Sequence, residues 1–293
     1  MASGLLLVDK PAGMTSHDVV SRARRALGTR RVGHAGTLDP MATGLLVLGV
    51  DGATRLLTYL VGLDKTYEAT IRLGASTDTD DADGEITATA DASGIPSSAI
   101  DTAVAALTGR IAQVPSTVSA IKVGGRRAYL LARAGEEVRL KSREVTVSRF
   151  DVLARTPRAE AVDLDVVVDC SSGTYIRALA RDLGAALGVG GHLTALRRTR
   201  VGPFPVADAV AVADIGPAAL CDPADVATAV LGRLDVSAEE ARDLRHGKRL
   251  AGHADRLTGP RAAAIDPDGR LVGVVERRGA DLKSAMNLPE ETE

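Results

Sequence analysis

The sequence contains no tryptophan, and only four tyrosines and two phenylalanines among 293 residues. Aliphatic side chains must therefore fill the core, and each aromatic residue becomes a candidate for a specific role. Two cysteines are present, Cys170 and Cys221, and their spacing fits neither a disulfide framework nor a metal site. The sequence also lacks a signal peptide and a hydrophobic run long enough to cross a bilayer. We therefore expect a cytoplasmic protein with reduced thiols and no membrane partner.

The chain has no strong excess of either charge, since its formal net charge is −2. This balance argues mildly against a nucleic-acid partner, but the distribution of charge argues for one. Basic residues cluster within 22–31, 122–143 and 197–200, and acidic residues concentrate within 78–85. A solvated helix face explains any one basic cluster equally well. Three clusters near a candidate site favour RNA or DNA, because a polyanion needs a basic face rather than a basic average.

One loop, residues 33–44, combines three glycines with the pair Asp39-Pro40. Glycine allows a close backbone approach to a ligand, and Pro40 favours an extended conformation at Asp39. A carboxylate at such a stiff corner is suited to act as a nucleophile, a base or a metal ligand. The alternative is a tight turn in which Asp39 bonds its own backbone, and local sequence alone favours this turn.

Patterns of hydrophobic residues and turn residues predict mixed helices and strands. In the first half we expect a strand at 4–8, a helix capped by Ser16 and ended by Gly28, a buried strand near 45–50, and a short helix at 53–61 carrying Arg55. Residues 65–73 alternate as a half-buried strand, and a helix over 96–109 precedes strands near 144–154 and 161–169. A smaller unit from Leu234 onward contains a helix and a hairpin.

Two further stretches leave their roles open. The acidic residues 77–84 resemble a calcium loop but lack its terminal glutamate and its glycine, so we expect a solvated acidic loop. Residues 110–143 are basic and poor in core residues, which indicates a projecting hairpin or arm suited to a phosphate backbone.

Arg177 falls in the first turn of a predicted helix, where the helix dipole disfavours a cation. Either an anionic partner explains this position, or Arg177 is an exposed arginine without a role.

Four motifs, in order along the chain, resemble those of the TruB family of pseudouridine synthases. They are residues 7–16 (Leu-Val-Asp-Lys-Pro-Ala-Gly-Met-Thr-Ser), 33–44, 65–67 (Lys-Thr-Tyr) and 173–177 (Gly-Thr-Tyr-Ile-Arg). The resemblance implies an α+β fold: a catalytic domain over residues 1–232 with a large mixed, mostly antiparallel sheet, and a small PUA-like RNA-binding domain over 233–293. The arm at about 110–143 would grip the T-loop of tRNA.

The resemblance also implies a reaction, isomerisation of the T-loop uridine at position 55 of tRNA, without cofactor or metal. Asp39 matches the catalytic aspartate, Arg177 the arginine that pairs with it, and Tyr67 the aromatic residue that stacks on the flipped base. The implied substrate-binding residues are His34, which fills the space left by the base, Tyr175 and Leu196 in the pocket wall, and Lys10, Arg55 and the arginines near 197–200. We expect a monomer.

Two other functions remain open at this point. A relative aimed at another uridine, or one that depends on a guide RNA, would share the motifs, although the arm favours recognition of the T-loop by the chain alone. An RNA-folding chaperone would bind tRNA without chemistry, and one protein can combine both roles. A metal-dependent nuclease is disfavoured, because no His, Asp and Glu cluster has a suitable spacing.

Overall fold

The computed structural model describes residues 3–117, 122–123, 126–127 and 140–289. The chain divides into two compact units. Unit 1 comprises Met1–Pro40, Gly44–Gly62 and Val201–Glu293, and unit 2 comprises Met41–Thr43 and Leu63–Arg200. The division by units does not test the predicted boundary at residue 233, which stays a prediction.

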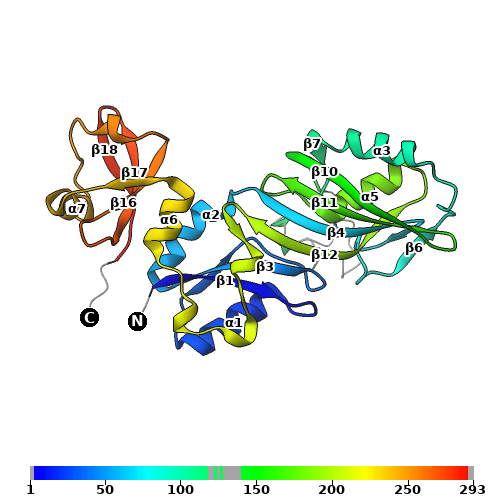
Figure 1. Ribbon diagram of the computed structural model, residues 1–293, viewed down its shortest axis with the longest axis horizontal. Coiled ribbons are helices and arrows are strands. Elements are labelled where there is room, and N and C mark those ends of the chain that lie inside the picture. Colours follow the sequence, from blue (N-terminus) through cyan, green and yellow to red (C-terminus); the bar gives the residue numbers. More distant parts are fainter. Residues whose placement is uncertain (1–2, 118–121, 124–125, 128–139, 290–293) are drawn as a thin grey trace. The chain divides into compact units, whose positions relative to one another are not determined.

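Unit 1 is built on a pair of antiparallel strands near the N-terminus. Strand β1 (Gly4–Lys10) pairs with β3 (Thr43–Val50) along its whole length, and β2 (Val32–Ala35) pairs with β3 as well. Between β1 and β2 runs helix α1 (Ser16–Leu27), which packs on β2 (Figure 1). The 3-10 helix η1 (Asp51–Leu56) and helix α2 (Leu57–Val61) follow β3. Because β1 and β3 are buried along almost their full length, they form the centre of this unit.

The start of α1 differs from its predicted cap. Thr15, not Ser16, is the N-cap: its side chain accepts from the Asp18 amide, and the Asp18 carboxylate accepts from the Thr15 amide. Both partners of this capping box stand in the sequence at the usual spacing. The predicted end of the helix is confirmed, since Gly28 adopts a left-handed conformation with φ of 66°.

The later part of unit 1 ends in a small sheet with its own core. The connecting elements are β13 (Phe204–Pro205), η2 (Val206–Asp208), β14 (Val210–Ala211, parallel to β1), η3 (Val212–Asp214), η4 (Pro217–Ala219) and α6 (Pro223–Leu231). The small sheet has the order β15 (Arg233–Asp235), β16 (Arg261–Ile265), β17 (Leu271–Arg278), β18 (Asp281–Asn287). Helix α7 (Ala238–Arg245) packs on it, and η5 (Ala254–Arg256) precedes β16.

Unit 2 is dominated by long antiparallel strands. They are β4 (Lys65–Leu73), β11 (Val162–Cys170), β10 (Arg143–Pro157) and β7 (Gly109–Gln113), in this spatial order, and β12 (Gly191–Val201) lies beyond β4. Helices α3 (Ser97–Ala106) and α5 (Ile176–Ala186) contact each other and lie on one face of these strands (Figure 1). Strand β4 buries every second residue, as its sequence predicts.

Short strand pairs complete unit 2. Strand β5 (Ala75–Thr77) pairs with β6 (Ile86–Thr89), and the acidic residues lie between them. Strands β8 (Lys122–Val123) and β9 (Arg126–Arg127) pair antiparallel, as a hairpin in the predicted arm requires. The rest of the arm between residues 118 and 139, including its predicted helix at 128–134, lies outside the described residues.

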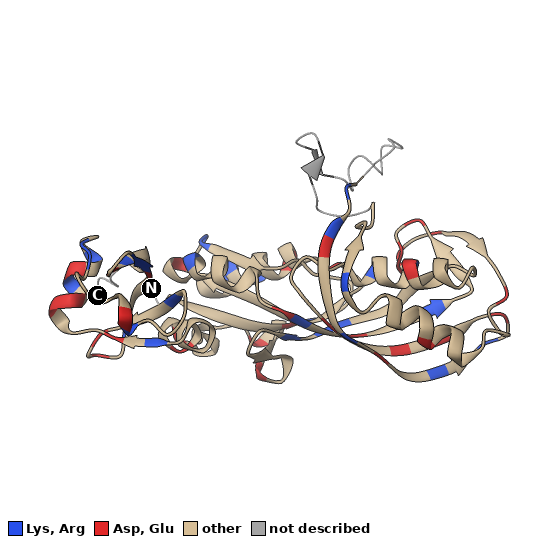
Figure 2. Ribbon diagram, turned by 90° about the horizontal axis from the view of Figure 1, so that it is seen from above, with Lys and Arg blue, Asp and Glu red and all other residues tan. Residues whose placement is uncertain are grey.

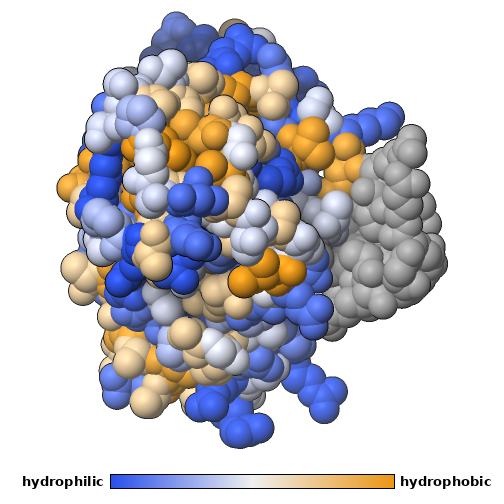
Figure 3. Space-filling view, turned by 90° about the vertical axis from the view of Figure 1, so that its right-hand side faces the viewer, coloured by the Kyte–Doolittle hydropathy of each residue, from blue (hydrophilic) through white to orange (hydrophobic). Residues whose placement is uncertain are grey.

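The predicted fold class is confirmed. Strands β1–β4, β7 and β10–β14 make a large mixed sheet in which antiparallel neighbours predominate, and β15–β18 make a separate small sheet. Lysine and arginine are interspersed with aspartate and glutamate along the described chain (Figure 2). On the face that carries α3 and β6, hydrophobic residues lie in small groups among hydrophilic ones (Figure 3). Among the described residues, every helix is too short or too polar to span a bilayer.

Candidate active site

The loop between β2 and β3 presents Asp39 in a half-buried position. The backbone of the loop requires glycine at two positions, because Gly36 and Gly44 have φ values of 87° and 98°. A side chain at either position would strain the chain. The loop is therefore shaped by its sequence, and Asp39 occupies its centre.

The residue before Asp39 is fixed by Ser16, the first residue of α1. The Leu38 amide donates to Ser16 Oγ at 2.8 Å, and Ser16 Oγ donates to the Leu38 carbonyl at 3.0 Å. Both residues are buried, with exposures of 2% for Ser16 and 3% for Leu38. Ser16 is thus a backbone clamp for the loop, which explains why a serine stands inside the helix boundary instead of at the cap.

The residue after Asp39 is fixed from the same turn. The Pro40 carbonyl accepts from the Gly13 amide at 2.9 Å and from Lys10 Nζ at 3.2 Å. Lys10 Nζ also donates to the carbonyls of Pro11 and Met14, at 2.9 and 2.6 Å. The turn 10–16 therefore holds the backbone on both sides of Asp39.

Lys10, predicted among the substrate-binding residues, lies in the interior of the protein. Its side chain is completely buried, and its ammonium bonds backbone carbonyls of the turn and of the loop. A buried ammonium needs such acceptors, because desolvation is costly without them. Lys10 thus holds the backbone of the turn and of the loop, and its role in substrate binding stays a prediction.

The remaining predicted residues of unit 1 flank this loop in the sequence. His34 lies on β2, half-buried and opposite Leu48 of β3. Arg55 lies in the last turn of η1 and is exposed, and its Nη1 donates to the carbonyl of Asn287 at 2.7 Å. Lys10, His34 and Asp39 are therefore connected through one segment of unit 1, while Arg55 belongs to the part that meets the C-terminal sheet.

Unit 2 carries the predicted aromatic and hydrophobic residues. Tyr67 on β4 is 7% exposed and stands opposite Val168 of β11, and Leu196 on β12 is 8% exposed. Arg198, predicted as a phosphate contact, is only 1% exposed. It shares the buried face of β12 with Leu196, because residues two apart on a strand point to the same side. Arg198 is therefore an interior cation in this structure, and its predicted phosphate contact stays a prediction.

The backbone of Tyr175 is held by a residue that the sequence did not single out. Gln113 at the end of β7 accepts from the Tyr175 amide at 2.8 Å and donates to the Tyr175 carbonyl at 3.0 Å. Gln113 is completely buried, so both bonds lie away from solvent. The guanidinium of Arg143 lies over the Tyr175 ring, 4.7 Å from its centre. Tyr175 thus has a fixed backbone and a covered ring.

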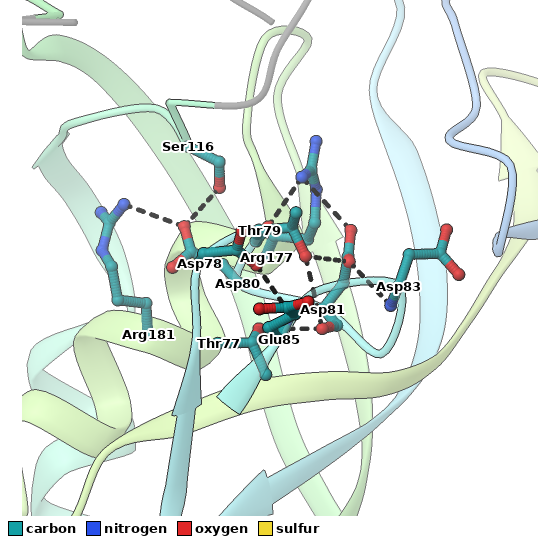
Figure 4. A network of polar contacts seen from close by, with 10 residues as sticks. All are labelled: Thr77, Asp78, Thr79, Asp80, Asp81, Asp83, Glu85, Ser116, Arg177 and Arg181. Atoms are coloured by element: carbon teal, nitrogen blue, oxygen red, sulfur yellow. Dashed lines mark hydrogen bonds and ion pairs between the residues drawn. The ribbon is translucent and has the colours of Figure 1, made fainter. Parts of the chain in front are cut away.

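Arg177, in the first turn of α5, has an anionic partner, which is one of the two alternatives that its position left open (Figure 4). Its Nη1 lies 3.2 Å from Asp81 Oδ2 and donates to the Thr79 carbonyl at 2.8 Å. The side chains of Arg177 and Asp81 are each only 4% exposed. Such a buried ion pair fixes the guanidinium in place, because neither charge is solvated if the pair separates.

The acidic segment between β5 and β6 is only partly the solvated loop that we expected, because Asp78, Asp83 and Glu85 are exposed but Asp81 is buried. Asp81 is 3% exposed, and its Oδ1 accepts from the Thr79 hydroxyl at 2.5 Å and from the Asp83 amide at 3.1 Å. Sequence patterns do not report this burial, because the partners Arg177 and Leu193 come from distant parts of the chain. Among the described residues, no three His, Cys, Asp or Glu side chains are grouped to hold a metal.

Asp80, beside Asp81, joins the acidic segment to two other elements (Figure 4). Its carboxylate accepts from Ser116 Oγ at 2.6 Å and lies 3.2 Å from Arg181 Nη1 of α5. Burial raises the pKa of Asp80, while Ser116 and Arg181 act in the opposite direction. Asp80 also has a positive φ of 61°, which is uncommon outside glycine. The network therefore fixes the backbone that carries Asp81.

Lys65, a further buried cation of unit 2, is the first residue of the motif that contains Tyr67. Burial and the neighbouring charge of Arg198 lower the pKa of Lys65 to about 8. Burial raises the pKa of the Cys170 thiol, which faces Lys65 across the strand pair, to about 11. Neither Cys170 nor Cys221 forms a disulfide.

Comparison with known proteins identifies the family to which the chain belongs. Residues 24–176 match the N-terminal domain of TruB family pseudouridylate synthase. Residues 177–235 match the tRNA pseudouridylate synthase B C-terminal domain, and residues 231–289 match the C-terminal part of tRNA pseudouridine synthase II. The matches together span the loop that carries Asp39 and the small C-terminal sheet.

Curated relatives are similar over nearly the whole chain. A protein named tRNA pseudouridine synthase B from Leifsonia xyli subsp. xyli is 57% identical, covering 99% of this chain and 97% of the relative. One of the same name from Arthrobacter sp. is 55% identical, covering 98% and 96%. A solved Cbf5-Nop10-Gar1 complex contains a chain with a TM-score of 0.72 at 24% identity, covering 97% of this chain and 84% of that one, which shows the shared fold. The chain belongs to the TruB family of pseudouridylate synthases and is an isomerase.

Proposed function

We propose that this chain isomerises the T-loop uridine of tRNA, at position 55, to pseudouridine, with Asp39 as the catalytic carboxylate. The names of the relatives from Leifsonia and Arthrobacter support tRNA as the substrate class. The observation that carries the role of Asp39 is the fixation of both its neighbours, Leu38 by Ser16 and Pro40 by Lys10 and Gly13. A carboxylate held in this way is preorganised for one geometry at the sugar.

The reaction breaks the N1–C1′ bond of the uridine, turns the base, and forms a C5–C1′ bond. The proton that leaves C5 balances the proton that N1 gains, so the isomerisation needs no co-reactant. Asp39 either attacks C1′ directly or removes a proton from the sugar on the way to a glycal. Both routes need an ionised carboxylate. We propose that Arg177 supplies the positive charge that keeps Asp39 ionised. Burial and the ion pair with Asp81 hold the Arg177 guanidinium in one place, which supports a fixed position for this charge.

The other side chains are proposed to handle the base. A uridine inside folded tRNA must be flipped out, which costs a few kcal/mol. We propose that Tyr67 stacks on the flipped base and assists proton transfer at C5, and that His34 occupies the space that the base leaves. Tyr175 and Leu196 would form pocket walls. The clamp of Gln113 on Tyr175 supports a rigid wall at that position.

We propose that further parts of the chain grip the RNA. The arm at about 110–143 would hold the T-loop, and the PUA-like residues 233–293 would contact RNA beyond it. The β8–β9 pair and the separate small sheet are consistent with these roles. The enzyme would act as a monomer. A tRNA-folding chaperone role would use the same binding without the chemistry.

The test is tritium release from a tRNA transcript labelled at uridine C5, with the wild type and Asp39→Asn. The wild type should release tritium only when position 55 is uridine, and Asp39→Asn should release none while binding the transcript with unchanged affinity. Asp268→Asn serves as the matched control, because it removes the same charge from an exposed turn. Release by Asp39→Asn at the wild-type rate would refute the catalytic role. Binding without release by the wild type would favour the chaperone role or another target RNA.

A further inference from the structure

A cavity of about 640 Å³ lies within unit 1, where η1 meets α7 and the end of β18. Its lining contains four basic side chains, Arg55, Arg242, Arg245 and His246, and no acidic one. The other lining residues are small, apolar or amide-bearing. A cavity of this size and composition is suited to a polar anion rather than to an apolar ligand, because its charged groups come from one sign only.

The cavity is held in shape by Asn287, at the end of β18. Its carbonyl accepts from Arg55 Nη1 at 2.7 Å, and its Nδ2 donates to the Leu244 carbonyl at 3.0 Å. Asn287 Oδ1 accepts from Ser284 Oγ at 2.5 Å. One residue thereby connects η1, which carries Arg55, to the C-terminal end of α7, which carries Arg242. The backbone elements that carry Arg55 and Arg242 are consequently held together before a ligand binds.

The charges in the cavity are only partly compensated. Arg245 forms an ion pair with the buried Asp266 at 2.9 Å. Arg55 has a backbone carbonyl as its hydrogen-bond partner and no carboxylate among the described residues. Arg242 is exposed and pairs with no acidic side chain in the described part of the chain. At least two guanidinium groups are thus available for an anion, since they lose no ion pair when one binds.

We infer that this cavity binds a backbone phosphate of the RNA substrate, through Arg242 and Arg55. Guanidinium groups match the tetrahedral oxygens of a phosphodiester, and two of them give it a preferred orientation. The inference rests on the proposed function, because it takes the RNA to be the substrate that the uridine site receives. The inference places a phosphate contact where η1 meets the C-terminal sheet. The sequence pattern did not indicate Arg242 as such a contact.

The test measures the affinity for a full-length tRNA transcript by filter binding between 50 and 300 mM KCl. Arg242→Gln should weaken binding about three- to tenfold at 100 mM KCl and reduce the slope of log K against log salt by about one. Arg242→Lys should restore most of the slope. Arg278→Gln is the matched control: it removes the same charge from an exposed residue at the end of β17, outside the cavity lining.

Three results would overturn the inference. The first is a salt slope for Arg242→Gln equal to that of Arg278→Gln and of the wild type. The second is loss of inorganic phosphate binding, measured by calorimetry, with unchanged tRNA affinity, which would make the cavity a site for free phosphate. The third concerns Glu290, Glu291 and Glu293, which follow the cavity in the sequence. If the effect of Arg242→Gln vanishes in a chain that ends at Pro289, Arg242 acts through this tail instead of the RNA.

The same samples separate this inference from the proposed function. In single-turnover tritium release, Arg242→Gln should need about three- to tenfold more enzyme than the wild type for the half-maximal rate, because the cavity affects binding. If the wild type releases no tritium but the salt slopes still differ, the proposed reaction fails and the phosphate site stands. If tritium is released and the slopes agree, the phosphate site fails alone.

Discussion

Replacing Asp81 with asparagine tests whether the acidic segment positions Arg177. The substitution keeps the shape of the side chain but removes the charge that lies 3.2 Å from Arg177 Nη1. A hydrogen bond to a charged group contributes about 1.5–3 kcal/mol. If this energy fixes the guanidinium for the reaction, its loss lowers the rate by about ten- to hundredfold, since each 1.4 kcal/mol is a factor of ten.

The assay is single-turnover tritium release at saturating enzyme, together with tRNA affinity and the thermal midpoint. Asp81→Asn should lower the rate while the affinity changes by less than about threefold, because Asp81 is buried and has no access to RNA. Asp83→Asn is the matched control, since Asp83 is exposed and contributes its backbone amide to the network. Thr79→Val removes one hydroxyl bond to Asp81 and keeps the charge, so its effect should be smaller.

A folded Asp81→Asn enzyme with the wild-type rate would refute this reasoning. Removing one partner of a buried ion pair can also destabilise the fold by about 3–5 kcal/mol. If Asp81→Asn does not fold, Thr79→Val still decides the matter. A wild-type rate in that variant would then show that the orientation of Asp81 does not affect Arg177.

Two further predictions concern the loop and a buried lysine. Ser16→Ala should lower both the thermal midpoint and the rate of tritium release, because the buried Leu38 amide loses its acceptor at a cost of about 1–3 kcal/mol; an unchanged rate would show that the clamp does not position Asp39. Lys65 has a pKa of about 8 in the folded protein, and its ordinary pKa is 10.5. Between these two pH values the unfolded chain therefore binds more protons at this site than the folded protein. The contribution of Lys65 to the free energy of unfolding consequently rises with pH across this range. The thermal midpoint of the wild type should therefore rise relative to that of Lys65→Met between pH 7 and pH 10, and a constant difference between the two would contradict the lowered pKa.

The sequence predicted those features that depend on nearby residues. The alternation in 65–73 placed Tyr67 on the buried face of β4, and Gly28 marked the end of α1, because strand periodicity and glycine conformation are local properties. The hydrogen bond between Lys10 and the Pro40 carbonyl joins residues thirty positions apart, and local patterns do not predict contacts over such a separation. Burial of Lys10 was consequently missed, although its motif had been recognised.

The positions of Asp81 and Gln113 show the same limit more strongly. Asp81 meets Arg177 nearly a hundred residues later, and Gln113 meets Tyr175 sixty-two residues later. A run of aspartates is typical of a solvated loop unless a distant cation covers it, and only the fold shows that cation. The sequence does contain a signal for Thr15 as the N-cap, because an aspartate three residues after a threonine is a capping-box pattern. The adjacent Ser16 is also a favourable capping residue, which explains the wrong prediction.

The clamp of Ser16 on Leu38 links the conformational freedom of the candidate catalytic loop to that of the N-terminal part of unit 1. The Leu38 amide is buried and bonded to the first residue of α1, so it exchanges its hydrogen with solvent only when that contact opens. Pro40 is tied to the same turn through Lys10 and Gly13. We therefore expect the loop that holds Asp39 to open together with β1 and α1, although it has no regular secondary structure of its own.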